Sequence, residues 1–168
     1  MADLSISTFK GQFISGARPN LYEVRIAELG AQLEFMAKAA SLPAFNIEQV
    51  EVPYMGRSIK VAGNRTFADW TVTVINDVDF AIRKQAEAWM AKINSHENND
   101  GEVDISGYMR DATVRQLDQS GAVVYNYDFK NIWPTEISEI SLGFEENNTI
   151  EEFTITFAVG SFWTSDAT

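Results

Sequence analysis

The sequence predicts a mostly β protein of the α+β class, an antiparallel β-barrel or sandwich with one packed α-helix and a long projecting hairpin. Several segments alternate apolar and polar residues with the period of two that half-buried strands require. A single segment, residues 78–93, shows the helical period instead. Strands and helices do not alternate along the chain, so a parallel sheet is not expected. The length of 168 residues fits one domain, residues 1–168.

The first part of the chain contains an arm and two predicted hairpins. Residues 1–17 are polar and small, and we expect an N-terminal arm that becomes ordered only against another surface. Residues 21–29 and 33–38 alternate as two strands and are predicted to form the first hairpin. Residues 45–69 form the projecting hairpin, with its turn at residues 53–56.

The register of the projecting hairpin follows from that turn. With residues 53–56 in the turn, Val50 faces Ile59 and Glu51 lies diagonal to Lys60, so an acidic strand pairs with a basic one. Neither face is cleanly apolar, which predicts that this hairpin stands out from the body. Its apolar residues then need a partner outside the subunit.

The middle of the chain changes from strand to helix. A strand that presents Trp70, Val72 and Val74 on one face is followed by Asn76 and Asp77, which can cap a helix. The helix carries an apolar stripe that we expect to face the core. This stripe consists of Val78, Ile82, Ala86, Trp89, Met90 and Ile93.

The last part of the chain is predicted as strands and turns. Residues 109–118 and 123–130 form two strands, and a corner at residues 133–135 leads into a further strand that ends at Phe144. One more strand precedes a C-terminal tail, residues 161–168. About nine strands and one long helix are expected in total.

The net charge of −11 restricts the partners. A surface this acidic repels phosphate groups, so a role in reading or packaging nucleic acid is not expected. The chain has no cysteine, which excludes disulfides, thiolate metal sites and thiol nucleophiles. No apolar stretch approaches the roughly 20 residues that span a bilayer, and no membrane partner is predicted.

No group of residues suggests catalysis. The single histidine, His96, lies in a loop whose Gly101 can be aligned with the glycine of a calcium loop, but the ligand positions at both ends do not match. Neighbouring acids such as Glu151 and Glu152 point to opposite faces of a strand and cannot act together as glycosidase carboxylates do. We therefore expect no catalytic, cofactor-binding or metal-binding residues.

Five segments in collinear order between residues 17 and 160 resemble the tail tube proteins of contractile-tailed bacteriophages. They are Ala17-Arg18-Pro19-Asn20-Leu21, Lys38-Ala39 with Leu42-Pro43, the run from Met55-Gly56-Arg57-Ser58-Ile59-Lys60 to Asp69-Trp70-Thr71-Val72-Thr73-Val74, Ile132-Trp133-Pro134-Thr135, and Glu152-Phe153. The fold of that family is similar to the fold of type VI secretion tube proteins.

The resemblance implies a structural protein and not an enzyme. Homohexameric rings would stack head to tail into the tail tube of a virion, which is assembled in the host cytoplasm. The implied partners are the tail sheath protein, the tape-measure protein, and the baseplate and tail terminator proteins. Phage DNA would pass through an acidic lumen without specific binding during genome ejection. A tube protein of a related contractile injection system is the nearest alternative.

The projecting hairpin supplies the predicted assembly interface. Its cations would contact carboxylates of neighbouring subunits, and its aromatic and methionine side chains would fill apolar hollows. The residues expected to make these contacts are Tyr54, Met55, Arg57, Lys60, Arg65, Phe67 and Asp69.

The sequence leaves two other classes of protein open. A ligand-binding β-barrel of lipocalin type would enclose a large apolar cavity and would sediment as a monomer even at high concentration. A hydrolase that uses carboxylates would act on a polysaccharide and would lose that activity when Glu is replaced by Gln.

Replacement of Arg65 by Glu, or of Phe67 by Asp, is expected to leave a folded monomer that no longer polymerises. Either change removes a contact of the hairpin with a neighbouring subunit without touching the predicted core. Electron micrographs of the purified variants check this outcome, and normal tubes from both would contradict the docking role.

Overall fold

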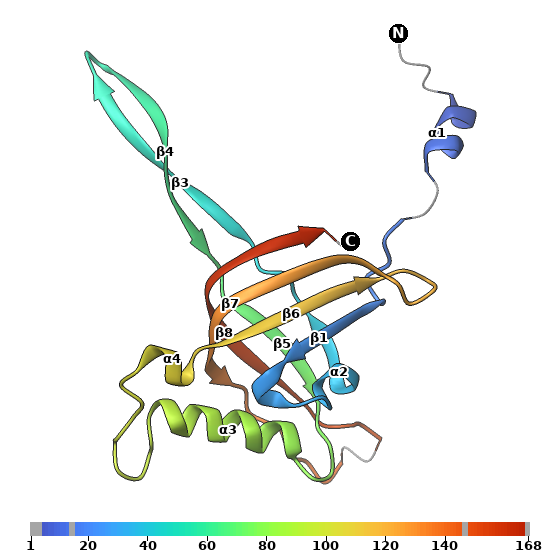
Figure 1. Cartoon of the computed structure of the whole chain (residues 1–168), viewed down its shortest axis with the longest axis vertical. Coiled ribbons are helices and arrows are strands. Elements are labelled where there is room, and N and C mark those ends of the chain that lie inside the picture. The colour runs from blue at the N-terminus through green and yellow to red at the C-terminus, as the bar shows by residue number, and fades with distance from the viewer. Residues whose placement is uncertain (1–4, 14–15, 146–147, 167–168) are drawn as a thin grey trace.

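The computed structural model describes residues 5–13, 16–145 and 148–166, and Figure 1 shows how its elements are arranged. The helices are α1 (Ile6–Gln12), the 3-10 helix η1 (Ala27–Leu29), α2 (Leu33–Met36), α3 (Ala81–Ile93) and α4 (Ile105–Tyr108). The strands are β1 (Tyr22–Ile26), β2 (Ala37–Ala40), β3 (Phe45–Tyr54), β4 (Arg57–Phe67), β5 (Trp70–Ile75), β6 (Arg110–Leu117), β7 (Val123–Ile137) and β8 (Glu152–Asp166). These described ranges therefore contain eight strands, one fewer than expected.

Six strands form one antiparallel sheet in the order β1-β6-β7-β8-β5-β2, and β3 and β4 form a separate two-stranded sheet. The larger sheet curls until its edge strands β1 and β2 meet (Figure 1), and the Tyr22 hydroxyl donates a 3.0 Å hydrogen bond to the Ala37 carbonyl there. Between β1 and β2, a side-chain hydrogen bond thus takes the place of the β-ladder that would otherwise close the barrel. The predicted antiparallel, mostly β fold is confirmed.

The first predicted hairpin, residues 21–38, is wrong. β1 pairs with β6, and β2 pairs with β5 on the opposite edge of the sheet. Between them the chain turns through η1 and α2, which bury Leu29 and Leu33 and leave Phe35 83% exposed. Residues 33–36 form a single helical turn, in which Leu33 points to the core and Phe35 points to solvent. A strand would have placed both side chains on the same face, as the alternation predicted.

Aromatic rings fill the interior of the barrel. Trp70 stacks on Phe129 at a ring-centroid distance of 4.5 Å and contacts Phe157 at 5.4 Å. Trp89 reaches Phe157 from the helix side at 6.0 Å. All four side chains are buried, so packed rings occupy the space that a lipocalin-type barrel would offer to a ligand.

Helix α3 covers the lower end of the barrel in Figure 1. Ile82, Ala86 and Trp89 are buried there, as the helical period of the apolar residues between 78 and 93 predicts. The indole Nε1 of Trp89 donates a 2.7 Å hydrogen bond to the Tyr108 carbonyl and so fastens α3 to α4. None of the helices in the described ranges combines the length and the apolar character of a membrane span.

The start of α3 differs from the prediction. The helix begins at Ala81, after Phe80 in a left-handed backbone conformation with φ of 53°. Asp77 accepts a 2.8 Å hydrogen bond from the Val78 amide and does not cap the helix. Val78 lies outside the helix and is 92% exposed, so its assignment to the core stripe is wrong.

Strand β7 runs through the predicted corner at residues 133–135. It ends at Ile137, and its pairing with β8 shifts register between Pro134 and Glu136. Proline cannot donate to a β-ladder, and a bulge is one of the places where a strand tolerates it. The strand predicted to end at Phe144 is therefore wrong, because that stretch belongs to the loop between β7 and β8.

Strand β8 is longer than the predicted last strand. It extends to Asp166, which lies opposite Tyr125 of β7. Residues 161–166, predicted as part of a C-terminal tail, therefore belong to the sheet, and the remaining two tail residues lie outside the described ranges.

A pair of valine-to-alanine variants tests this division between core and surface. Val72→Ala removes two methyl groups from a fully buried position, and we expect the free energy of unfolding to fall by about 2 kcal/mol. Val78→Ala makes the same chemical change at the exposed position and is expected to stay within about 0.5 kcal/mol of the parent. Urea denaturation followed by circular dichroism measures both, and equal losses would contradict the burial described above.

Candidate assembly interface

Strands β3 and β4 project from the barrel as a long hairpin (Figure 1). Every residue of β3 is exposed, and in β4 only Gly63 and Phe67 are partly covered. The turn consists of Met55 and Gly56, with φ angles of 44° and 80°. Two successive residues at positive φ make the tight turn that matches the twist of a hairpin.

This two-residue turn corrects the predicted turn at residues 53–56 and changes the register. Val50 faces Val61, and Val52 faces Ile59. Four β-branched apolar residues therefore lie on one face, each between 47% and 61% exposed, and we call them the apolar stripe. The shift of two residues leaves each side chain on its predicted face, and Arg57, opposite Tyr54, lies on the same face as the four apolar residues.

The hairpin carries three cations, Arg57, Lys60 and Arg65. Lys60 lies directly opposite Glu51, and the guanidinium of Arg65 lies 5.4 Å from the ring centroid of Phe45. Among the described residues, however, no ion pair includes any of the three cations. Their charges are therefore available to carboxylates of another molecule.

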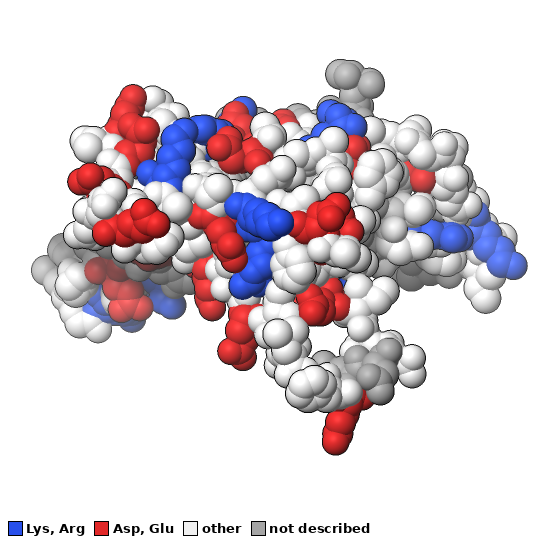
Figure 2. Space-filling view, turned by 90° about the horizontal axis from the view of Figure 1, so that it is seen from below, with Lys and Arg blue, Asp and Glu red and all other residues white. Residues whose placement is uncertain are grey.

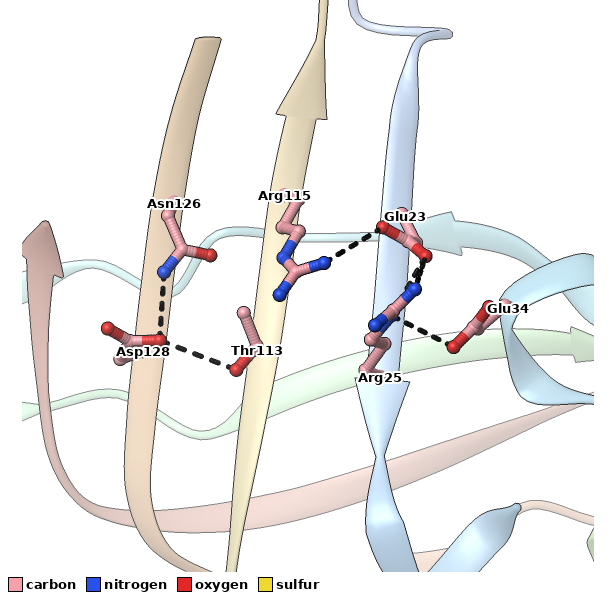
Figure 3. A network of polar contacts seen from close by, with 7 residues as sticks. All are labelled: Glu23, Arg25, Glu34, Thr113, Arg115, Asn126 and Asp128. Carbon is pink, nitrogen blue, oxygen red and sulfur yellow. Dashed lines mark hydrogen bonds and ion pairs between the residues drawn. The ribbon is translucent and has the colours of Figure 1, made fainter. Parts of the chain in front are cut away.

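The cations of the sheet are paired instead. On the outward face of β1, Arg25 lies 2.6 Å from Glu23 and 2.9 Å from Glu34, and Arg115 of β6 lies 3.7 Å from Glu23. The hydrogen bond to Glu23 raises the pKa of Arg25. Figure 3 shows the whole network, formed by Glu23, Arg25, Glu34, Thr113, Arg115, Asn126 and Asp128. The sheet face thus satisfies its own charges, whereas the hairpin does not.

The seven predicted contact residues fall into separate groups. Tyr54 and Met55 are 65% and 86% exposed at the tip, and Arg57 lies beside them, opposite Tyr54. Lys60 and Arg65 lie farther along β4. The structure thus brings three of the predicted residues together at the tip of the hairpin.

The other two predicted residues lie at the base of the hairpin. Phe67 packs against the hydrophobic core and so holds the hairpin on the barrel. Asp69 is exposed in the two-residue link between β4 and β5. Phe67 is therefore a structural residue as well as a candidate contact.

Sequence reasoning missed a second surface, which we call the lower loops and define as residues 76–80, 138–145 and 148–151. They lie at the lower end of the barrel in Figure 1. Val78, Leu142 and Phe144, predicted as helix or strand residues, are 92%, 82% and 104% exposed there. Figure 2 views the molecule from this end and shows carboxylates spread over the surface with cations set between them.

The N-terminal arm carries exposed aromatic residues. Helix α1 stands apart from the barrel in Figure 1, and Ser5 caps it by accepting a hydrogen bond from the Thr8 amide. Phe9 and Phe13 stack on each other at 5.4 Å and are 63% and 57% exposed. This arrangement fits an arm that binds another surface.

The fold is that of tubes in contractile injection systems. A chain of the PVC sheath-tube complex in its extended state, from an extracellular contractile injection system, matches with a TM-score of 0.66 and 15% identity over 98% of this chain and 100% of that chain. A chain of the anti-feeding prophage tube terminating cap matches with a TM-score of 0.67 and 18% identity over 91% of this chain and 93% of that chain. At such identities the likeness shows the fold alone.

Sequence comparison identifies the family. Residues 7–165 match the family described as phage tail tube protein. The tail tube protein gp19 of Enterobacteria phage T4 is 38% identical over 148 residues, which cover 88% of this chain and 90% of gp19. The chain therefore belongs to the phage tail tube protein family, and it is a structural subunit of a virion tail and not an enzyme.

Substitutions at the base and the tip of the hairpin should separate stability from assembly. Phe67→Ala is expected to lower the free energy of unfolding by about 1–3 kcal/mol, because it removes a ring that packs partly on the core. Tyr54→Ala is expected to change it by less than about 0.5 kcal/mol. Urea melts of dilute monomer measure both values, and a larger loss at Tyr54 would refute this assignment.

The same contact alters the expectation for Phe67→Asp. A carboxylate at this position destabilises the subunit itself, so a loss of tubes in that variant would not report on docking. Arg65→Glu, at an exposed position, remains the informative change.

Proposed function

We propose that this chain forms the inner tail tube of a contractile-tailed phage, in which hexameric rings stack head to tail into a hollow conduit for genome ejection. The hairpin carries the proposal, because a bare two-stranded sheet is at best marginally stable in water. Its apolar stripe and its cations need an external surface, and a neighbouring copy of the chain supplies one in every ring. A contact between different patches on identical subunits, repeated along an axis, generates a filament.

The size of a six-membered ring suits a conduit. If each subunit contributes about four strands to a shared inner wall, the ring holds about 24 strands. With about 4.8 Å between strands and a tilt of about 40°, this wall closes at a backbone diameter near 48 Å. The bore left inside the side chains is wide enough for duplex DNA.

The charge of the chain suits passage of DNA. Basic side chains in a lumen would bind phosphates and release counterions, whereas carboxylates repel phosphates and let the polymer slide. A net charge of −11 per subunit therefore supports a lumen that does not bind DNA specifically.

The partners follow from the same architecture. The likeness to chains of a sheath-tube complex and of a tube terminating cap supports a tail sheath protein around the tube and a tail terminator at one end. A baseplate at the other end and a tape-measure protein in the lumen complete the proposed set. A related contractile injection system would use the same tube, but the identity to a phage protein favours the tail.

Arg57→Glu tests the proposal at the tip of the hairpin. Purified parent protein is expected to form hollow tubes in negative-stain micrographs, and the variant is expected to stay folded but form none, because it places a carboxylate on an acidic partner. Lys92→Glu, the same type of charge reversal at an exposed position on α3, is the matched control and should form normal tubes.

Two results would refute the proposal: a parent protein that never assembles under any condition, or tubes of equal yield from Arg57→Glu and Lys92→Glu.

A further inference from the structure

One outward face of the barrel carries a row of hydroxyl side chains. Strands β5 and β8 are paired, and each alternates buried apolar residues with threonines that point away from the core. The chain after β2 and strand β7 each add one hydroxyl beside these threonines. We call this set the hydroxyl face and define it as Ser41, Thr71, Thr73, Thr135, Thr154 and Thr156.

The threonines of the hydroxyl face contact one another across the strands. Thr73 lies directly opposite Thr154, and their hydroxyl oxygens are 3.4 Å apart. Thr71 lies opposite Thr156, and its hydroxyl oxygen is 3.0 Å from that of Ser41. Cross-strand threonine pairs of this kind stabilise a sheet. Because a hydroxyl has one donor and two acceptor lone pairs, each keeps some hydrogen-bonding capacity for water.

Few charges lie beside the hydroxyl face. As the structure describes them, strands β2, β5 and β8 together contain one lysine and no arginine. This residue, Lys38, forms an ion pair of 2.5 Å with Glu152 of β8. Glu136 of β7 lies opposite Thr156 and, in the described ranges, takes part in no ion pair. Within those ranges the face therefore presents hydroxyls and one unpaired carboxylate, but no unpaired cation.

The opposite side of the barrel is highly charged. Strands β6 and β5 are three places apart in the order of six strands, so their outward faces point in opposite directions. Around β6, Arg25 and Arg115 share Glu23, and Lys130 is paired with Asp111. A paired arginine can still exchange its carboxylate for a phosphate, which accepts the same forked donors. This side would therefore hold a passing phosphate chain more strongly than the hydroxyl face.

We infer that the hydroxyl face lines the bore of the proposed tube and forms a hydrated wall, without unpaired cations, along which the phosphates of duplex DNA pass. A neutral hydroxyl makes a weaker hydrogen bond to phosphate than a cation does, so water replaces it easily. The net charge of the subunit still repels DNA at longer range. Strands β2, β5, β7 and β8 are then the four that each subunit supplies to the inner wall. This assignment rests on the proposed function, since it requires a hollow tube.

A single cysteine can locate the hydroxyl face in the tube, because the chain itself contains none. Tubes of Thr73→Cys are treated with a small maleimide dye, which can enter the bore, or with a maleimide coupled to a globular protein wider than the bore. We expect the dye to label the tubes along their length and the protein conjugate to leave them unlabelled, whereas both reagents label the unassembled subunit. Thr113→Cys, on the opposite side of the barrel, is the matched control and should not show labelling by the dye alone.

Every other labelling pattern would overturn the assignment. If both reagents label Thr73→Cys tubes, the hydroxyl face lies on the outside of the tube. If neither does, the face is buried between copies of the chain. Labelling by the dye alone at Thr113→Cys would place the opposite side of the barrel in the bore. A parent that forms no tubes would instead refute the proposed function together with this inference.

Thr73→Lys tests why the wall lacks unpaired cations. One lysine in each subunit places a ring of cations in the bore, where contacts with phosphates release counterions. Circular dichroism first establishes that the variant is folded. Its tubes, mixed with short duplex DNA at low salt, are expected to protect about tenfold more of the duplex from nuclease than parent tubes do, and added salt should abolish this protection.

Two control variants separate charge and position in this experiment. Thr73→Val removes the hydroxyl without adding a charge, and Thr113→Lys adds the same charge on the opposite side of the barrel. Both are expected to protect no more DNA than the parent. Equal protection by Thr73→Lys and Thr113→Lys tubes, or none by either, would overturn the inference. If Thr73→Lys does not fold or assemble, the cysteine labelling decides.

Discussion

The hairpin β3–β4 cannot bury its own apolar face, and this constraint organises the molecule. The barrel has a core of its own, built from buried aromatic rings. The apolar stripe, by contrast, has only its cross-strand partners, and half of its surface stays in water. Two strands alone rarely hold together under such conditions. On the function proposed above, a neighbouring copy of the chain covers this face.

Strand β5 connects the hairpin β3–β4 to the rest of the fold. Its first residue, Trp70, stacks in the core directly after the link from the hairpin, and Phe67 packs on the same core just before that link. Its far end carries the lower loops, which are hydrogen-bonded to the neighbouring strand β8 and to α3. Because close-packed interiors transmit displacement with little loss, a load applied at the hairpin reaches the opposite end through this strand. The core therefore keeps the two ends in a fixed relation, which the proposed stack of identical rings would require.

The alternation of apolar residues was sufficient to find β5, the buried face of α3 and the existence of the hairpin. It failed where the apolar residue has no partner inside the subunit, as at Val78 and Phe144, because periodicity predicts burial but not which molecule provides it. The hairpin register failed for a local reason. Met55 adopts a positive φ that non-glycine residues rarely take, so the sequence favoured a four-residue turn over the two-residue turn.

The distribution of charge also bears on the proposed assembly. Subunits with a net charge of −11 repel one another, so attraction must be concentrated at one contact. The cations of the larger sheet form ion pairs, such as that of Arg25 with Glu23. Among the residues that the structure describes, the three cations of the hairpin form none, so the hairpin is a basic projection from an acidic body. In the proposed tube, a head-to-tail contact would set the cations of one hairpin against the acidic body of the next copy, whereas two hairpins brought together would place like charges against each other. Like-charge contacts of this kind disfavour the wrong arrangement, so the position of the unpaired cations favours a tube with one direction along its length.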